Sequence, residues 1–251
     1  MKTQIVLSIG MPRAGSAWCY NLTHDLVVAA GGANARSIRE KYRLQRFLTE
    51  INCLIPSLSF HRLLPVMVPI AFEAPYVINS HGGRKPLADI FIKSGLLKPT
   101  FISRDPRDTA LSAFEYGQRV PADKNAFQKG FNFFSQFSTI DDAIHFMERY
   151  IPVANGWLTC DQALNVRYED LLLNYAHETQ RLIDFLEIDA NTPGLDEVLE
   201  RYDPASRTSR EKGTHFVKGK IGRYREAFTE EQKALSAEIF GTYLEAQGYE
   251  V

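Results

Sequence analysis

The sequence predicts one α/β domain over residues 1–251, with a central parallel β-sheet flanked by helices. An apolar run at 5–9 ends at Gly10 and leads through a glycine-containing turn into a helical pattern, as nucleotide-binding α/β domains often begin. Two later apolar runs of strand length are followed by helical patterns, which favours a parallel sheet. The hydrophobic fraction of 45% suits a single core, and no repeat or linker marks a second domain.

Each element is expected from a local pattern. Strands are expected at 5–9, 76–79, 100–103 and 164–166, because short apolar runs are typical of buried parallel strands. Helices are expected from apolar spacing at 18–30, 107–116, 141–150, 170–186 and 229–247. The polar, Gly- and Lys/Arg-rich stretch 203–224 lacks periodicity, and we expect a long functional loop there.

Two helix starts carry recognisable caps. Asp105 is the expected N-cap of the helix at 107–116, with Pro106 at the first helical position and Asp108 completing a capping arrangement. Thr229, with Glu and Gln in the turn after it, is the expected start of the last helix.

Composition excludes several classes of protein. The net charge of −1, with both signs mixed along the chain, argues against a nucleic-acid binder and against a long polyanionic acceptor. Cys19, Cys53 and Cys160 are scattered and lack zinc spacing, so we expect reduced thiols and no metal. The N-terminal apolar run is too short for a signal peptide, and charges and prolines interrupt 51–76. A cytoplasmic protein without a membrane span is predicted.

The turn at 12–16 has the features of an anion site. Gly15 lets backbone N–H groups approach an anion, the helix dipole favours negative charge there, and Arg13 and Ser16 add a cation and a hydroxyl. A plain connection with a capping serine explains the turn equally well. An ATP-type loop would need a Lys followed by Ser or Thr, and this turn has neither that pair nor an obvious acidic Mg²⁺ ligand nearby.

A second anion site is indicated at the end of the strand 100–103. Starting a helix explains Asp105 and Pro106, but it does not explain Arg104 at a strand end. Ser112 follows Asp105 by seven residues, about two turns of helix, and so lies on the same face as the cap. Arg104 and Ser112 can therefore converge on one anion.

Four segments, in order over nearly the whole chain, resemble sulfotransferases that use 3′-phosphoadenosine-5′-phosphosulfate (PAPS). PRAGSAW at 12–18 resembles the family's 5′-phosphosulfate loop, usually PKSGTTW, and SRDPRDTALSAF at 103–114 resembles its 3′-phosphate site. VRYEDLLLN at 166–174 resembles the segment whose Tyr reaches the adenine, and HFVKGKIGRYREAFT at 215–229 resembles the RKGxxGDW loop. Any one segment alone would be weak evidence; four in order are specific.

The resemblance implies the cofactor contacts. The 5′-phosphosulfate is expected at Arg13, Ala14, Gly15, Ser16 and Ala17; the adenine at Trp18, Tyr168 and Ser206; and the 3′-phosphate at Arg104, Ser112, Lys218 and Gly219. A dianionic phosphate favours several charge-assisted donors, as this last set offers. For Trp18 and Tyr168, burial as plain core aromatics remains the alternative.

His81 is the expected general base. It follows the strand 76–79, where ligands of open α/β sheets gather, and INSHGGR at 78–84 resembles the family's KTHLP, whose His is the base. A neutral imidazole can take a proton from an acceptor hydroxyl near pH 7, while Arg13 stabilises charge on the departing phosphate. The alternative is a surface-loop histidine beside two glycines.

The sequence also departs from the family's pattern. Arg13 and Ala17 replace a Lys and a Thr of the first loop, and Asn79 replaces the Lys of KTHLP. Val217 and Tyr224 replace the Arg and the Trp of RKGxxGDW, which puts part of the cofactor contacts in doubt. The cytosolic dimerisation motif KxxxTVxxxE is matched only at Thr229, so that dimer is not supported.

The predicted function is metal-independent transfer of a sulfuryl group from PAPS to a hydroxyl or amine of a small, partly apolar acceptor. Acceptor segments are expected at about 35–75 and 117–140, which mix Phe, Leu and Ile with Arg and Lys. Two alternatives remain open. One is an ATP-dependent kinase of the same fold, and the other is a nucleotide-binding module that has lost catalysis.

Overall fold

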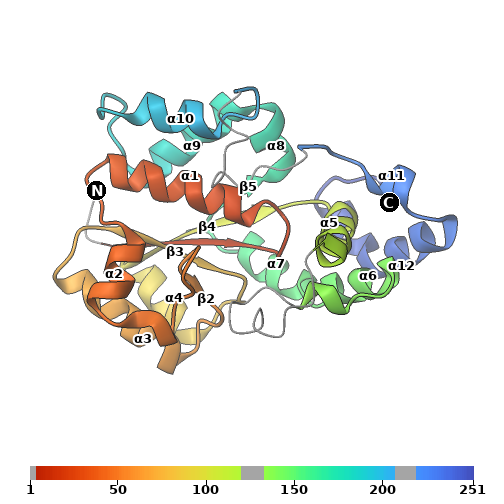
Figure 1. The fold of residues 1–251 in the computed structure, drawn as a ribbon, viewed down its shortest axis with the longest axis horizontal. Coiled ribbons are helices and arrows are strands. Elements are labelled where there is room, and N and C mark those ends of the chain that lie inside the picture. Colours follow the sequence, from red (N-terminus) through yellow and green to blue (C-terminus); the bar gives the residue numbers. More distant parts are fainter. Residues whose placement is uncertain (1–3, 120–132, 207–218) are drawn as a thin grey trace.

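The computed structural model describes residues 4–119, 133–206 and 219–251, and its centre is a five-stranded parallel sheet (Figure 1). The strands are β1 (Ile5–Gly10), β2 (Leu54–Ile55), β3 (Tyr76–Ser80), β4 (Leu97–Ser103) and β5 (Leu164–Arg167). Their order is β2-β3-β1-β4-β5, and every neighbouring pair is parallel. The chain passes from β1 to the edge strand β2, returns to β3 beside β1, and then crosses to β4 and β5 on the other side of β1; this parallel sheet confirms the predicted fold class.

Helices cover both faces of the sheet. They are α1 (Ser16–Ala29), α2 (Ala35–Lys41), α3 (Phe60–Met67), α4 (Pro86–Lys93), α5 (Pro106–Arg119), α6 (Ile140–Glu148), α7 (Ile151–Leu158), α8 (Tyr168–Leu173), α9 (Tyr175–Leu186), α10 (Leu195–Tyr202), α11 (Tyr224–Ala227) and α12 (Glu230–Ala246). Short 3₁₀ turns are η1 (Leu44–Arg46), η2 (Val68–Ala71) and η3 (Phe134–Gln136). Figure 1 shows α1, α9 and α10 on one side of the sheet and α4 and α7 on the other.

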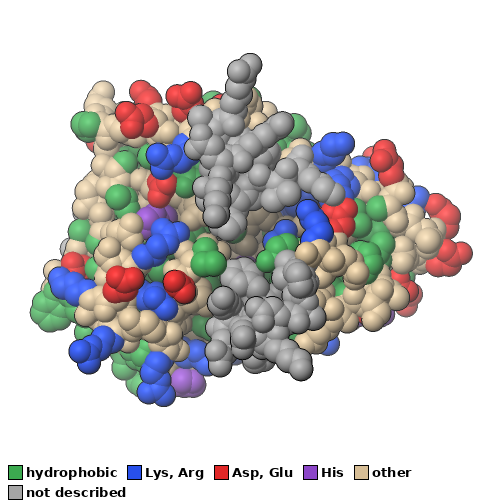
Figure 2. Space-filling view, viewed as in Figure 1, with side chains coloured by type: hydrophobic (Ala, Val, Ile, Leu, Met, Phe, Trp, Pro, Cys, Tyr) green, Lys and Arg blue, Asp and Glu red, His purple; other side chains and the backbone are tan. Residues whose placement is uncertain are grey.

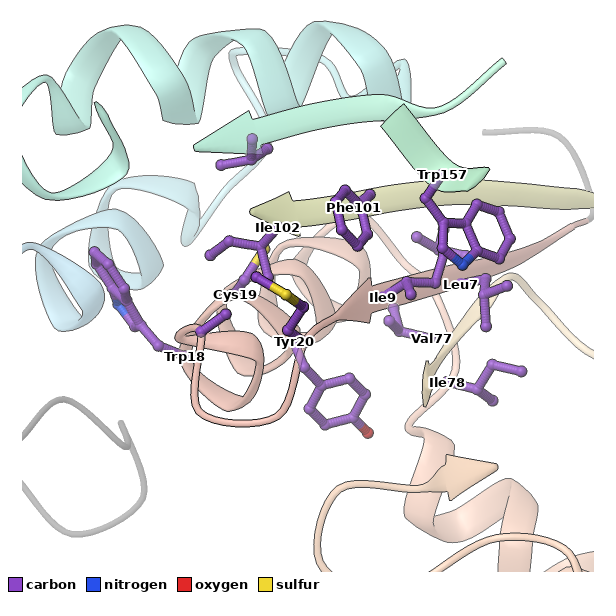
Figure 3. Packing of buried hydrophobic residues seen from close by; sticks show 14 of the residues in the cluster. Leu7, Ile9, Trp18, Cys19, Tyr20, Val77, Ile78, Phe101, Ile102 and Trp157 are labelled. Atoms are coloured by element: carbon purple, nitrogen blue, oxygen red, sulfur yellow. The ribbon is translucent and has the colours of Figure 1, made fainter. Parts of the chain in front are cut away.

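The core lies on both faces of the central strands. Phe101 and Ile102 are consecutive residues of β4, so their side chains point to opposite faces, and both are fully buried. Figure 3 shows Ile102 beside Cys19 of α1 and Phe101 on the side of Trp157 of α7. Burial on both faces explains why the strands appear in the sequence as continuous apolar runs.

One expected helix needs correction, and one strand was missed. The stretch 170–186 forms two helices, α8 and α9, because the backbone leaves helical geometry at Asn174 (φ −122°, ψ 44°). The two-residue strand β2 was not predicted, since its length gives no periodicity to detect. By contrast, the cap at Thr229 is confirmed: its side chain accepts from the Gln232 N–H, and the Gln232 side chain accepts from the Thr229 N–H.

The start of α5 confirms one predicted cap and corrects another. Asp105 Oδ1 accepts from the Arg107 N–H at 2.9 Å, as an N-cap should. Asp108 does not complete that cap. Its carboxylate instead accepts from the backbone N–H groups of Gly222 (2.7 Å) and Tyr224 (3.1 Å), so it binds α5 to the segment 219–224. The buried amide of Tyr224 needs an acceptor, and Asp108 supplies one both to it and to the half-buried Gly222.

Candidate active site

The residues singled out in the sequence gather at one edge of the sheet. The turn 11–15 follows β1, His81 follows β3, Arg104 follows β4, and Tyr168 follows β5. Because all strands are parallel, these four segments leave the sheet at its carboxyl edge. The connection from β1 runs to one side of the sheet and the connection from β3 to β4 crosses to the other side, and ligands of open α/β sheets bind at such a switch point.

The turn after β1 adopts a conformation suited to an anion. Arg13 (φ 68°) and Gly15 (φ 86°) both have positive φ, and a Cβ added at Gly15 would lie 2.6 Å from Tyr168 Cδ2. Glycine is therefore required at this position on two counts. Helix α1 begins at Ser16 without a hydrogen bond from a side-chain cap, so Ser16 and Ala17 present first-turn N–H groups that a phosphate can accept.

The side chain of Arg13 is a largely desolvated cation. Its guanidinium carbon lies 4.3 Å from the centroid of the Tyr116 ring, and its buried Nε has no hydrogen-bond partner within 4–119, 133–206 and 219–251. Burial is the main cause that lowers the pKa of Arg13. A cation in this state gains from a neighbouring anion.

Arg104 ties three segments together. It is only 6% exposed, its guanidinium carbon lies 4.0 Å from the Tyr168 ring centroid, and its Nη2 is 3.6 Å from Asp108 Oδ2. Its guanidinium also donates to the carbonyls of Arg13 (3.4 Å) and Lys220 (3.2 Å). A strand-end arginine is thus fixed between the turn after β1, α5 and the segment 219–224.

The other predicted 3′-phosphate residues are Ser112, Lys218 and Gly219, and the structure describes two of them. Ser112 is half-buried on α5, two turns beyond Asp105. Gly219 is half-buried at the start of the segment held by Asp108, while Lys218 lies outside the described residues.

Trp18 and Tyr168 belong to one aromatic cluster. Trp18 is 2% exposed, its Nε1 donates to the Tyr202 carbonyl at 3.1 Å, and its ring is nearly parallel to that of Tyr175 at 6.4 Å. The Tyr168 ring meets Trp18 edge-on at 5.9 Å. Ser206 follows this cluster in a turn closed by its N–H on the Asp203 carbonyl. The rings of Trp18, Tyr168 and Tyr175 therefore pack together, with Tyr168 against Gly15 of the turn 11–15. Adenine binding to this cluster stays a prediction.

His81 has a defined tautomer. Its Nδ1 lies 2.6 Å from the Gly10 carbonyl oxygen, which can only accept, so Nδ1 carries the proton. The neutral ring then has its lone pair on Nε2. Burial lowers the pKa of His81, and the bond to Gly10 offsets only part of that effect, so the neutral ring is favoured. Trp157 Nε1 donates to the Gly82 carbonyl at 2.9 Å and anchors the loop that follows.

One charged residue of the site, Arg223, was missed in the sequence, and Glu115 was considered there only as an alternative base, as was Glu73. Arg223, in the segment held by Asp108, forms an ion pair with Glu115 of α5. Burial is the main influence on both neighbouring groups, since it raises the pKa of Tyr168 and lowers that of Arg13; Arg223 acts weakly against the first shift and Glu115 against the second, so the pair lies near both groups. The only available signal was their charge, because residues 108 positions apart cannot be paired by a local pattern.

The departure at Asn79 lies inside the sheet. Asn79 is buried in β3, in register with Ser8 of β1, and its Oδ1 has no hydrogen-bond partner in the part of the chain that the structure describes.

Over the described residues there is no group of three or more His, Cys, Asp or Glu side chains able to hold a metal ion. Nor does any helix among them have the length and apolar character to cross a membrane.

Comparison with known proteins decides the family. The family model described as "Sulfotransferase domain" matches residues 3–248. The chain belongs to the sulfotransferase family. This confirms the predicted family, and it favours a PAPS-dependent enzyme over the kinase alternative.

Solved sulfotransferase structures share the fold. Mouse sulfotransferase SULT7A1 complexed with PAP is 15% identical with a TM-score of 0.62, covering 97% of this chain and 86% of that one. Retinol dehydratase in a complex with retinol and PAP is 16% identical with a TM-score of 0.59, covering 97% and 82%. The same enzyme with androsterone and the inactive cofactor PAP gives 16% and 0.58, covering 97% and 81%. Among curated proteins, no sequence matches this chain.

Proposed function

We propose that this sulfotransferase binds PAPS at the carboxyl edge of its sheet and transfers the sulfuryl group to a hydroxyl or amine of a small, partly apolar acceptor. One observation carries the proposal. His81 donates from Nδ1 to the carbonyl of Gly10, the residue that leads into the turn 11–15. The basic Nε2 of a neutral imidazole therefore belongs to the same edge as the proposed phosphosulfate loop.

The cofactor contacts are proposed by position. Arg13, Ala14, Gly15, Ser16 and Ala17 would hold the 5′-phosphosulfate, Trp18, Tyr168 and Ser206 the adenine, and Arg104, Ser112, Lys218 and Gly219 the 3′-phosphate. The burial of Arg13 and Arg104 supports these roles, because charge-assisted hydrogen bonds are strong where water is excluded.

The reaction is a single in-line displacement at sulfur. The acceptor oxygen forms a bond to sulfur as its proton passes to His81 Nε2, and the bond from sulfur to the 5′-phosphate oxygen breaks. The electron pair of that bond leaves on the phosphate of PAP. Arg13 and the first N–H groups of α1 stabilise this charge, which is electrostatic catalysis at a helix N-terminus.

The acceptor is proposed to bind on the β2 side of His81. A Cβ added at Gly82 would lie 3.6 Å from Ser57 Cα, so the segment that follows β2 flanks the histidine loop. This segment belongs to the expected acceptor region at about 35–75, whereas most of the other, 117–140, lies outside the described residues. A structural relative of this fold was solved with retinol, a small apolar alcohol, which supports the acceptor class.

A cytoplasmic location is also proposed. Cys19, Cys53 and Cys160 are free and buried. Unpaired thiols are typical of proteins from reducing compartments.

The direct test is turnover. The purified protein is incubated with PAPS and a panel of phenols and aliphatic alcohols, and sulfated product and PAP are measured by mass spectrometry. The proposal expects sulfated product from PAPS and no phosphorylated product from ATP. Phosphorylation with ATP would restore the kinase alternative, and tight PAP binding without product from any acceptor would favour the inactive module.

A further inference from the structure

Helix α3 and the turn η2 expose an apolar stripe. Phe60, Leu64, Val68 and Phe72 recur every four residues, and all four are exposed, from 40% at Leu64 to 75% at Phe72. Phe60 and Leu64 are one turn apart on α3 and share a face of that helix, and Val68 of η2 and Phe72 directly after η2 extend the exposed apolar surface. The opposite face packs into the core through Leu63 and its neighbours. This stretch is therefore apolar on both sides.

An apolar outer face is unusual for a surface helix, which normally turns polar residues to water. Single exposed apolar residues need no explanation, but contiguous ones mark interaction surfaces. Between residues 60 and 74, the exposed positions are Phe60, His61, Leu64, Val68, Ala71, Phe72 and Ala74. Only one of them, His61, is polar, so the exposed surface is apolar along nearly its whole length.

Basic residues flank the Phe72 end of the stripe. Lys41 Nζ lies 2.5 Å from Glu73 Oε1, and the Tyr42 hydroxyl donates to the same oxygen at 2.7 Å, so residues 41–43 lie beside this end. Arg43 and Arg46 follow in the chain, and both are exposed. Glu73, the acidic residue next to the stripe, is neutralised by Lys41.

The wider region carries a local positive charge. Residues 36–73 hold six Lys and Arg against three Glu, whereas the whole chain has a net charge of −1. Figure 2 shows hydrophobic side chains and Lys or Arg side chains next to one another at the lower left, with a few Asp or Glu side chains among them, where Figure 1 places α2, α3 and α4. Apolar and cationic groups thus share one corner of the molecule.

We propose that this corner, formed by the stripe Phe60–Leu64–Val68–Phe72 and the basic turn 41–46, docks on an anionic lipid bilayer. Aromatic and aliphatic side chains on one helix face insert at the level of the headgroups, and adjacent cations contact anionic lipids. A second copy of the chain is a poorer occupant, because a two-fold interface would bring two such positive regions together.

The stripe begins at the edge of the proposed active site. Ser80 Oγ donates to the Ile55 carbonyl at 3.1 Å, and residues 56–59 connect that strand to α3 beside the histidine loop. A bilayer on this face would present membrane-partitioned alcohols close to His81. This last step rests on the proposed function, whereas docking itself needs neither PAPS nor turnover.

The experiment is co-sedimentation of the protein with lipid vesicles. Vesicles of phosphatidylcholine alone are compared with vesicles that also contain phosphatidylserine. The test variants are Phe60→Ser/Phe72→Ser and Arg43→Glu/Arg46→Glu. The matched controls are Leu173→Ser, which changes a residue 70% exposed on α8, and Arg149→Glu, which changes an exposed arginine elsewhere. PAP binding checks that each variant is folded.

We expect the wild type to prefer the vesicles with phosphatidylserine and each test variant to bind them about tenfold more weakly. Both controls should bind like the wild type. No binding by the wild type, or equal losses in test variants and controls, would overturn the proposal. A wild-type dimer that Phe60→Ser/Phe72→Ser converts to a monomer, without any vesicle binding, would instead assign the face to a second copy.

Discussion

The two sides of the sheet's carboxyl edge hold their functional residues by different means. On the β4–β5 side, Arg104 and Asp108 are buried and bonded to the turn after β1 and to the segment 219–224. On the β2–β3 side, His81 makes one bond to a backbone carbonyl, and the helix beyond it exposes apolar side chains. The proposed cofactor side is thus fixed by a buried charged network, whereas the proposed acceptor side depends on surface segments that can vary with little effect on that network.

The largest effect is expected at His81. His81→Ala removes the proposed base, and turnover should fall by about two to four powers of ten, the usual scale for general-base catalysis. PAP should still bind, because its phosphates would contact the other side of the edge. The measurements are kcat with saturating PAPS and acceptor, and PAP affinity by calorimetry.

A matched control is Glu115→Gln, which changes a carboxylate that is the alternative candidate for the base and that is paired with Arg223. It should reduce turnover far less than His81→Ala. A folded His81→Ala enzyme that keeps more than about a third of wild-type turnover would transfer the role of base to a carboxylate, with Glu115 the first candidate.

The pH dependence sharpens the same assignment. The base acts only when neutral, and burial lowers the pKa of His81 below its usual value, so activity is retained above that pKa and lost as pH falls through it. We expect kcat to decline by about tenfold per pH unit on an acid limb that lies below pH ~6.5. A limb centred above pH ~7 would be incompatible with a buried, neutral imidazole.

On the cofactor side, Asp108→Asn should weaken PAP binding by about tenfold, or roughly 1.4 kcal/mol. The carboxylate holds two N–H groups of the segment next to the proposed 3′-phosphate ligands Lys218 and Gly219, and an amide accepts less strongly. Calorimetry with PAP and with adenosine 5′-monophosphate should show the larger loss for PAP.

The control for this substitution is Asp105→Asn. Asp105 caps α5 and pairs with Arg107 in the core, so its loss should lower the melting temperature and leave the preference for PAP intact. If Asp108→Asn lowered the melting temperature without weakening PAP binding, Asp108 would have the same structural role as Asp105, and the proposed difference between the two carboxylates would be wrong.

The smallest effect is expected from metal removal. Arg13, Arg104 and the start of α1 supply the positive charge that a divalent ion would otherwise provide, so excess EDTA should leave the rate nearly unchanged. A large loss of rate in EDTA that added Mg²⁺ reverses would contradict a site whose positive charge comes from protein side chains and N–H groups.

The sequence predicted most of the cofactor side and little of the acceptor side, for a physical reason. Strand, glycine turn and helix are local patterns, so β1, α1 and the cap at Asp105 could be read directly. The pairing of Asp108 with Gly222 joins residues 114 positions apart, and no local pattern distinguishes it from a helix cap.

The acceptor side lacks such patterns. Strand β2 has two residues, which is too short to show a period, and α3 has eight residues with Pro65 inside it, which argues against a helix in the sequence. What could be predicted there was composition: apolar residues among basic ones. The structure adds that these two kinds of residue form one exposed surface.

The most direct test of the account is whether Arg104 binds the 3′-phosphate and so distinguishes ligands that carry it from ligands that lack it. Calorimetry compares Arg104→Ala with the wild type, using PAPS and adenosine 5′-phosphosulfate, which lacks the 3′-phosphate. Arg107→Ala, a buried arginine paired with Asp105, serves as the structural control. We predict that Arg104→Ala weakens PAPS binding by about one to two powers of ten, as expected for a lost charged hydrogen bond, and leaves adenosine 5′-phosphosulfate nearly unaffected. Equal losses for both ligands would contradict the account, because Arg104 would then only hold the edge together.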